Sequence, residues 1–337
     1  MIARLFLWFT ALVFVLAASV AVWLYRDFSH FTQQVLTLPE EGEILHVKKG
    51  MTLRAVANTL AEKGITQHPH YLIWLGRKLK QDSGIKTGEF QLQPGLTPID
   101  LLATLNKGTV IQHGITIIEG QTFKNVLASL INNPKIESTL DGLSTEEVMT
   151  ALGYADQKPE GRFLADTYYY TKGTPDRDLL KRAYQSTEQY LEKVWPERAA
   201  DLPLESPYEA LILASIIEKE TAIADERPRI AGVFVRRLVK GMRLETDPTV
   251  IYGMGEDYKG DIRYKDLRTD TPFNTYTRKG LPPTPIASTG KAAIDAALHP
   301  AEEDVLFFVA EGGGRHYFSK TYAEHKKAVK RYLNRNK

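Results

Sequence analysis

The stretch that most constrains the fold of this 337-residue chain is residues 206–222, which reads SPYEALILASIIEKETA. Ser206 is a good helix N-cap, Pro207 suits the first helical turn, and Glu209 completes a capping box. Residues 210–217 are apolar apart from one serine, so the pattern predicts a helix that is buried on most sides.

Glu218 stands near the end of this predicted helix. At about 100° per residue, its neighbours on the helix surface include Ala214, Ser215 and Ala222, and such small side chains leave room for a groove. Loss of solvation disfavours the charged form of an acid, so a Glu withdrawn from water can stay protonated and act as a general acid. The alternative is that residues 218–220 form the solvated end of the helix.

An apolar stretch near the N-terminus predicts a membrane anchor. Residues 5–25 are apolar apart from Thr10 and Ser19, and about 21 residues are enough to cross a bilayer. The alternative is a cleaved signal peptide, but the apolar run is longer than an ordinary signal sequence. Arg4 favours a cytoplasmic N-terminus, which predicts a single-pass protein of the inner (cytoplasmic) membrane with an extracytoplasmic, periplasmic C-terminal part.

Composition excludes several classes of function. The net charge is +2 and no dense basic tract is present, which argues against nucleic acid as a partner. No His/Asp/Glu cluster has metal-ligand spacing, so we expect neither a metal nor another cofactor. The absence of cysteine fits an exported protein without deciding the compartment.

The predicted fold class is α+β. We expect a cytoplasmic stub and anchor over residues 1–26, a polar linker over 27–43, a small domain over 44–112 and a larger α+β catalytic domain over 113–337. The segments 109–111 and 115–118 favour strands, and Ser288 or Thr289 is expected to cap a helix over 290–298.

A weak internal repeat lies mainly in the small domain. Gly50, Gly95 and Gly120 are each followed, two positions later, by a threonine that opens an apolar-periodic helix. This pattern resembles LysM-type glycan-binding units, which place two helices on a short two-stranded sheet. The alternative is an ordinary small α+β domain that spaces the active part from the membrane.

The segment 274–286 cannot form a regular element because it contains three prolines, a glycine and many hydrogen-bonding groups. Long polar loops with aromatic residues are typical of functional surfaces. We therefore expect chemistry in this part of the chain.

Four motifs, in order, resemble those of the YceG-like family. They are EGRFLADTY at 160–168, ASIIEKET at 214–221, LETDPTV at 244–250 and YTRKGLPPTPI at 276–286. The resemblance extends over nearly the whole chain from Ile44. One departure is Ala165, where the family usually has proline, which bears on the stiffness of that loop.

The resemblance implies a membrane-anchored endolytic lytic transglycosylase. Such enzymes cleave the β-1,4 bond between N-acetylmuramic acid (MurNAc) and N-acetylglucosamine (GlcNAc) in peptidoglycan and leave a 1,6-anhydro end. It also implies that Glu218 is the catalytic acid, with Glu220 as the alternative. One carboxylate can suffice because the 6-hydroxyl of the substrate, rather than water, attacks the anomeric carbon.

Five further residues are candidates for binding the sugar or its peptide: Asp247, Asn274, Tyr276, Arg278 and Arg315. Arginine suits carboxylates through its two-pronged guanidinium group, and tyrosine can stack on a sugar face. Asp247 could instead cap a turn before Pro248, and Tyr276 could simply pack within its loop.

The expected partners are peptidoglycan glycan strands, the membrane and, from the resemblance alone, peptidoglycan synthases (penicillin-binding proteins). Two other functions stay open. One is a non-enzymatic scaffold that binds the wall through the LysM-like units. The other is a water-using muramidase, which would need a second carboxylate such as Asp247 near the cleaved bond.

Overall fold

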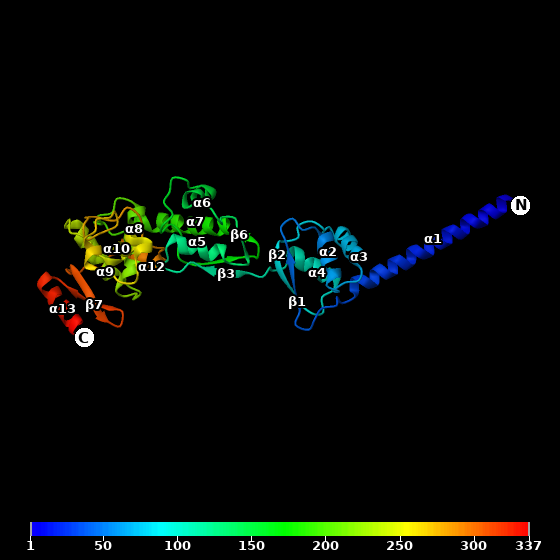
Figure 1. The fold of residues 1–337 in the computed structure, drawn as a ribbon. Coiled ribbons are helices and arrows are strands. Elements are labelled where there is room, and N and C mark those ends of the chain that lie inside the picture. Colours follow the sequence, from blue (N-terminus) through cyan, green and yellow to red (C-terminus); the bar gives the residue numbers. More distant parts are fainter. Residues whose placement is uncertain (1, 336–337) are drawn as a thin grey trace. The chain divides into compact units, whose positions relative to one another are not determined.

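The computed structural model describes residues 2–335 of a mixed helix-and-strand chain (Figure 1). The chain divides into two compact units. Unit 1 comprises the residues up to His113 together with Thr171–Gly173, and unit 2 comprises Gly114–Tyr170 with the residues from Thr174 onward. The α+β fold class predicted from the sequence is thereby confirmed.

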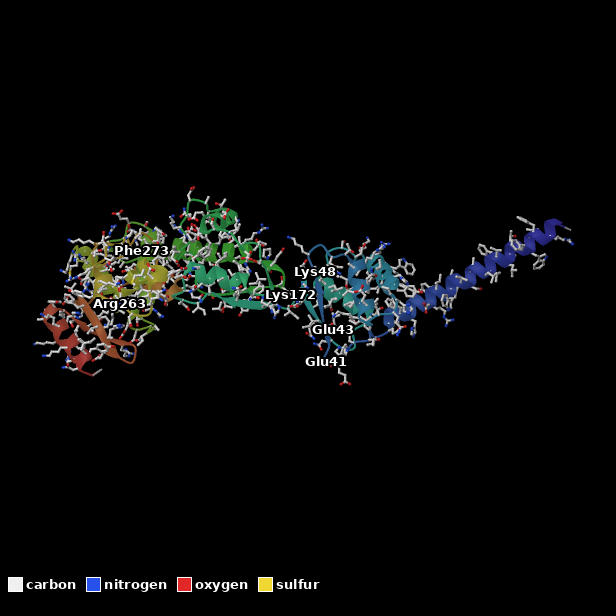
Figure 2. The ribbon with its side chains drawn as sticks, viewed as in Figure 1. Glu41, Glu43, Lys48, Lys172, Arg263 and Phe273 are labelled. Carbon is white, nitrogen blue, oxygen red and sulfur yellow. The ribbon has the colours of Figure 1, made fainter. Side chains whose placement is uncertain are left out.

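Unit 1 is built on a two-stranded antiparallel sheet. Its elements are α1 (Ile2–Gln33), β1 (Glu43–Val47), α2 (Leu53–Glu62), α3 (Pro69–Lys78), β2 (Gly88–Leu92) and α4 (Pro98–Lys107). Glu43 pairs with Leu92, and Val47 pairs with Gly88. Lys172, labelled in Figure 2, belongs to this unit and donates to Glu89 of β2 at 3.0 Å. The alternating apolar residues of both strands pack on α2, α3 and α4 to form the core.

Helix α1 has two parts that differ in burial. Its N-terminal part carries exposed large apolar side chains from Phe6 to Tyr25, and the helix is long and apolar enough to cross a membrane. Beyond that part, Phe28 and Phe31 are buried in the core of unit 1, as is Leu36. This corrects the polar linker predicted over residues 27–43, because their apolar side chains fold with unit 1.

Threonine and glycine define the helix starts that formed the weak repeat. Thr52 accepts a hydrogen bond from the backbone of Ala55, and Thr97 accepts one from Asp100. Thr122 occupies the N-cap position of the third helix without a side-chain bond. The three preceding glycines all have positive φ, which explains why glycine precedes each start.

Unit 2 has two halves that follow each other along the chain. The first half contains β3 (His113–Thr116, beginning at the boundary of unit 1), α5 (Phe123–Ile131), β4 (Ile136–Glu137), α6 (Thr145–Leu152), β5 (Thr167–Tyr170), β6 (Thr174–Pro175), α7 (Asp176–Val194) and the short 3₁₀ helix η1 (Trp195–Glu197). The second half contains α8 (Pro207–Glu220), α9 (Arg227–Val239), α10 (Asp247–Met254), η2 (Gly255–Asp257), α11 (Tyr264–Arg268), α12 (Lys291–Leu298), β7 (Phe307–Gly312), β8 (Arg315–Ser319) and α13 (Tyr322–Arg335).

The strands of unit 2 form small separate sheets. β3 pairs with β5, β4 pairs in parallel with β6, and β7 pairs antiparallel with β8 around a bulge between Ala310 and Gly312. The strand predicted over 109–111 is wrong, since the structure assigns no regular element there and the strand begins at His113.

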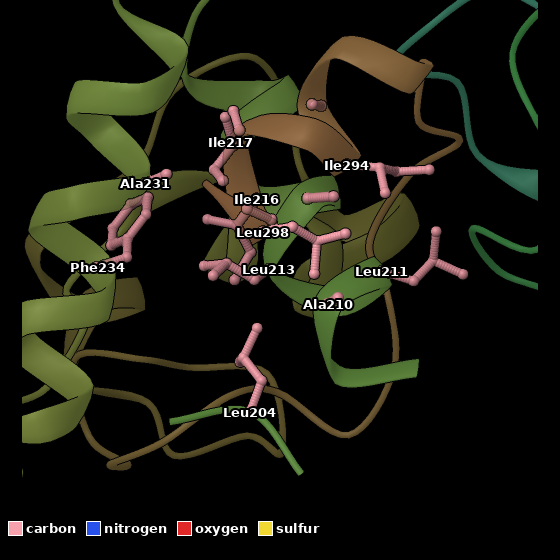
Figure 3. Packing of buried hydrophobic residues seen from close by; sticks show 14 of the residues in the cluster. Leu204, Ala210, Leu211, Leu213, Ile216, Ile217, Ala231, Phe234, Ile294 and Leu298 are labelled. Carbon is pink, nitrogen blue, oxygen red and sulfur yellow. The ribbon is translucent and has the colours of Figure 1, made fainter. Parts of the chain in front are cut away.

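The predicted helix over 206–222 is α8, and it lies at the centre of one of the two cores of unit 2. Every residue from Ala210 to Ile217 is buried. Figure 3 shows Leu213, Ile216 and Ile217 of α8 in one cluster with Ala231 and Phe234 of α9 and with Ile294 and Leu298 of α12. The α8 helix is thus held on several sides, which fixes the position of the residues at its C-terminal end.

Candidate active site

The start of α8 is capped as predicted, with one difference. The Ser206 hydroxyl accepts a hydrogen bond from the backbone N–H of Glu209 at 3.3 Å. The Glu209 carboxylate, however, accepts from the backbone of Glu205 at 2.7 Å instead of closing a capping box with Ser206. The N-terminus of α8 therefore still has one side-chain cap. This cap fixes the residue at which the helix begins, and with it the direction in which Glu218 points.

The carboxyl group of Glu218 is largely removed from solvent, because its side chain is only 5% exposed. Its Oε2 atom accepts a hydrogen bond from the backbone N–H of Gly290 at 3.0 Å, and Arg227 Nη2 lies 3.8 Å from Oε1. Burial raises the pKa of Glu218, while the Gly290 N–H and the Arg227 charge oppose that rise. The alternative reading, a solvated helix end, is therefore wrong for Glu218.

Gly290 has no side chain, and the place that its Cβ atom would occupy, called the gap at Gly290 below, lies beside this carboxyl group. A Cβ atom built at Gly290 would lie 3.6 Å from Oε2 of Glu218 and 3.2 Å from Cγ and Oε1 of Glu119. Gly290 is also the N-cap of α12, so neither Ser288 nor Thr289 caps that helix as predicted. The partial positive charge at the N-terminus of α12 favours a negative group at this point.

Glu119 is a second acidic residue at this place that the sequence did not indicate. It is exposed, lies in the turn before α5, and its charge raises the pKa of Glu218 further. A signal was present in the sequence, since Gly120 next to it belongs to the repeat. No short-range sequence pattern, however, indicates that this turn lies beside the end of α8.

Glu220 points to a different side of α8, as two successive steps of 100° require. Its carboxyl group accepts a hydrogen bond from the Thr246 hydroxyl, and burial raises the pKa of Glu220 to about 7. A cavity on this side is lined by Glu220, Asp247 and Tyr276 together with residues of β7, β8 and α13. The two acids of α8 therefore occupy separate environments.

Asp247 and Tyr276 form a pair in the lining of that cavity. The Tyr276 hydroxyl donates to Asp247 Oδ1 at 2.6 Å, and the side chain of Asp247 is otherwise exposed. Burial and the neighbouring carboxylate raise the pKa of Tyr276. Both residues lie on the Glu220 side of α8, whereas Glu119 lies on the Glu218 side.

Asn274 is buried and organises its own loop. Its side-chain amide donates to the carbonyl groups of Asp266, Leu267 and Thr269, and its Oδ1 accepts from the backbone of Tyr276 at 2.8 Å. The candidate role of Asn274 in sugar contact is therefore corrected, because the side chain is only 1% exposed and its amide hydrogens are engaged.

Arg278 and Arg315 are exposed and each is paired with an acid. Arg278 makes two parallel bonds of 2.9 Å to Asp270, which hold the pKa of Asp270 at about 2. Arg315, on β8, donates to Asp225 at 3.1 Å. The residues that the sequence suggested for substrate binding thus do not form a single cluster around Glu218.

The four sequence motifs, by contrast, meet in space. The first motif packs on the fourth, because a Cβ atom built at Gly161 would lie only 2.3 Å from Cβ of Pro285. The fourth motif contacts α8, since the backbone N–H of Ile286 donates to the Ser215 hydroxyl at 3.0 Å. The motif at 244–250 contacts α8 through Thr246 and contacts the motif at 276–286 through Asp247. Among residues 2–335, no group of three or more His, Cys, Asp or Glu side chains is arranged to hold a metal ion.

A sequence profile of the YceG-like family matches residues 45–331. The chain belongs to the YceG-like family. An endolytic murein transglycosylase of Bacillus subtilis (strain 168) is 31% identical over 308 residues, which cover 86% of this chain and 84% of that protein. An endolytic murein transglycosylase of Streptococcus pneumoniae (strain D39) is 25% identical over 322 residues, covering 86% of this chain and 58% of that protein.

The crystal structure of a YceG-like protein from Listeria monocytogenes has a similar fold. It aligns with a TM-score of 0.50 and 26% identity, covering 86% of this chain and 99% of that chain. Membership of the YceG-like family, which the motifs suggested, is therefore confirmed.

The first YceG-like motif also contains a buried acid that the sequence did not single out. Glu160 accepts hydrogen bonds from the backbone of Phe123 at 3.0 Å and from the Tyr252 hydroxyl at 3.1 Å. Burial raises the pKa of Glu160 to about 7. Glu160 thereby joins the start of α5 to α10, so it holds the surroundings of the site in place.

Proposed function

We propose that this protein is an endolytic lytic transglycosylase that cleaves peptidoglycan. The bond is the β-1,4 linkage from MurNAc to GlcNAc, and the product carries a 1,6-anhydro-MurNAc end. The main support is that relatives of the same family, one of them 31% identical over 84% of its length, are endolytic murein transglycosylases.

In this proposal Glu218 serves first as acid and then as base. It gives its proton to the glycosidic oxygen, and the bond from that oxygen to the anomeric carbon of MurNAc breaks. The 6-oxygen of the same MurNAc forms a bond to that carbon, and its proton passes to the Glu218 carboxylate. No water is consumed and the enzyme returns to its starting protonation state.

The surroundings of Glu218 support both steps. Burial of a side chain that is 5% exposed favours the protonated acid needed for the first step. Once the proton has left, the Gly290 N–H at 3.0 Å and the guanidinium of Arg227 stabilise the carboxylate. We therefore assign the role to Glu218 rather than to Glu220, whose carboxyl group is engaged by Thr246.

Substrate would be held by the exposed side chains of Asp247, Arg278 and Arg315 and by the half-buried Tyr276. Asp247 and Tyr276 could bind sugar hydroxyls, while Arg278 and Arg315 could bind carboxylates of the lactyl-peptide. Asn274 would act indirectly by fixing the loop that carries Tyr276 and Arg278.

The remaining parts of the proposal concern location. α1 would anchor the chain in the inner membrane, with units 1 and 2 on the periplasmic side. The region 44–112, with two helices between two paired strands, would be a LysM-like glycan-binding domain, and the region 113–337 would be catalytic. Peptidoglycan synthases would be partners, since cutting nascent strands near the membrane requires proximity to polymerisation.

Digestion of defined glycan strands by the detergent-solubilised full chain, followed by mass spectrometry, tests the activity and the acid together. We expect wild-type protein to release anhydro-ended fragments and Glu218→Gln to be about 10²–10⁴-fold slower while still binding strands. Glu220→Gln is the matched variant and should retain activity. Unchanged product formation by Glu218→Gln would reject its role, and loss of activity in Glu220→Gln alone would move the role to Glu220.

One alternative receives support from the geometry. A water-using muramidase needs two carboxylates, and Glu119 lies beside the gap at Gly290 whereas Asp247 lies on the other side of α8. The same digest separates the possibilities. Reducing ends would indicate hydrolysis, and intact strands would indicate the non-enzymatic scaffold.

A further inference from the structure

The turn that carries Glu119 is fixed firmly next to the end of α8. The backbone N–H of Gly120 donates to Ser288 at 2.9 Å, and the N–H of Ser288 donates to Gln121 at 2.7 Å. On the other side, Nζ of Lys219 donates to the Gly120 carbonyl at 3.2 Å. The backbone beside Glu119 is therefore tied both to the segment before α12 and to α8.

The carboxyl groups of Glu119 and Glu218 border the same gap. Both come within 3.6 Å of the position that a Cβ atom at Gly290 would occupy. They differ in solvation, since Glu119 is exposed and Glu218 is largely buried. Loss of water favours the protonated form of the buried Glu218.

We propose that Glu119 is a positioning residue of the reaction, whose negative charge acts on Glu218 across the gap at Gly290. The proposal rests on the lytic transglycosylase activity proposed above. The charged or polar groups that face Glu218 are Arg227 from α9, Lys219 from α8, the Gly290 N–H from the start of α12, and Glu119. Glu119 is the one acid among these four and offsets three groups that favour loss of the proton.

The test is the pH dependence of anhydro-product formation by the full chain on defined glycan strands. Without the Glu119 charge, Glu218 should lose its proton at lower pH. We expect Glu119→Gln to shift the alkaline limb of the kcat profile to lower pH, with a rate about 3- to 10-fold lower on that limb. Glu119→Asp, which keeps the charge, should restore most of the wild-type profile.

Two further variants show whether the gap and the charge matter specifically. Gly290→Ala introduces a methyl group 3.2 Å from the Glu119 side chain. Because that side chain is exposed, it can rotate away from the methyl group, and the backbone conformation at residue 290 should not change. We expect its profile to resemble that of Glu119→Gln. Glu192→Gln, an exposed acid on α7, is the control and should leave the profile unchanged. Circular dichroism and melting temperature verify that each variant is folded.

Each result has one interpretation. If the alkaline limb of Glu119→Gln coincides with that of wild type, or the rate falls equally at every pH, the proposal for Glu119 is overturned while the activity stands. If wild type forms reducing ends that Glu119→Gln no longer forms, Glu119 is a hydrolytic base and the proposal is also overturned. If wild type forms no new ends at all, the proposed function itself has failed.

Discussion

At the scale of single residues, the site depends on how buried acids are solvated. Glu218 and Glu160 are both removed from water, and in both the pKa is raised for that reason. The two acids have different hydrogen-bond partners and therefore different roles. Glu218 accepts from the Gly290 N–H and lies near Arg227, whereas Glu160 joins α5 to α10 through Phe123 and Tyr252 and so serves the fold.

Removal of the Arg227 charge should have the opposite effect to removal of the Glu119 charge. Arg227 lies 3.8 Å from Glu218 and favours its ionised form. We therefore expect Arg227→Gln to move the alkaline limb of the kcat profile to higher pH, by up to about one unit. A shift to lower pH, measured on the same strands, would contradict this account of the site.

Glu160 makes stability depend on pH. Its folded pKa of about 7 lies above the ordinary value of 4.5, so its contribution is full below pH 4.5 and is lost as pH rises through 7. Glu160→Gln keeps the shape without this loss: its Oε1 can still accept from the Phe123 N–H, and its Nε2 can donate to the Tyr252 hydroxyl instead of accepting from it.

We expect the difference in the free energy of unfolding between Glu160→Gln and wild type to increase as the pH rises. Urea unfolding should show Glu160→Gln equal to wild type near pH 4.5 and more stable at pH 8, by up to roughly 3 kcal/mol. A difference that does not change between these two pH values would show that Glu160 does not titrate in this range.

At the scale of elements, the irregular segment 269–290 is ordered by side chains rather than by a regular backbone pattern. Asn274 joins it to α11 by donating to the carbonyl groups of Asp266 and Leu267, and donates to Thr269 as well. The Ser215 hydroxyl of α8 accepts from Ile286. Phe273, labelled in Figure 2, packs on the Tyr252 ring with centroids 4.8 Å apart. The segment can therefore hold Tyr276 and Gly290 at fixed points without being a helix or strand.

Asn274→Ala tests this ordering. It leaves three carbonyl groups without the Asn274 amide as hydrogen-bond donor. Loss of these buried hydrogen bonds should lower the free energy of unfolding by about 2–3 kcal/mol. Arg278→Ala, a change at an exposed ion pair in the same segment, is the control and should leave stability nearly unchanged. Equal melting temperatures for Asn274→Ala and the control would show that the loop does not depend on Asn274.

At the scale of the whole molecule, α1 joins a candidate anchor to a folded unit. Its apolar part is exposed, but Phe28, Phe31 and the following Leu36 belong to the core of unit 1. The Tyr71 hydroxyl donates to Asp27 at 2.8 Å, so the end of α1 is also held by a polar contact. Unit 1 therefore includes the end of this helix.

Truncation separates these two roles of α1. A chain that begins at Asp27 should be soluble without detergent and should keep the melting temperature of unit 1. A chain that begins at Glu43 loses the buried Phe28, Phe31 and Leu36. Burial of such side chains contributes about 1.5–3 kcal/mol each, so unit 1 should be severely destabilised. Equal stability of the two chains would support a linker over 27–43.

The sequence by itself determined the features that depend on neighbouring residues. Caps such as Ser206 and Thr97, the apolar period of α8 and the prolines of the 274–286 loop specify their elements because helix and turn preferences act over a few positions. Together with the four motifs, they were enough for the fold class and the family.

Only the tertiary structure brought Glu119 to Glu218, separated Glu220 from it, buried Asn274 and folded Phe28 into unit 1. These outcomes depend on contacts between residues far apart in the chain. Such contacts form when whole apolar faces pack together, and local sequence patterns do not specify which distant groups then become neighbours.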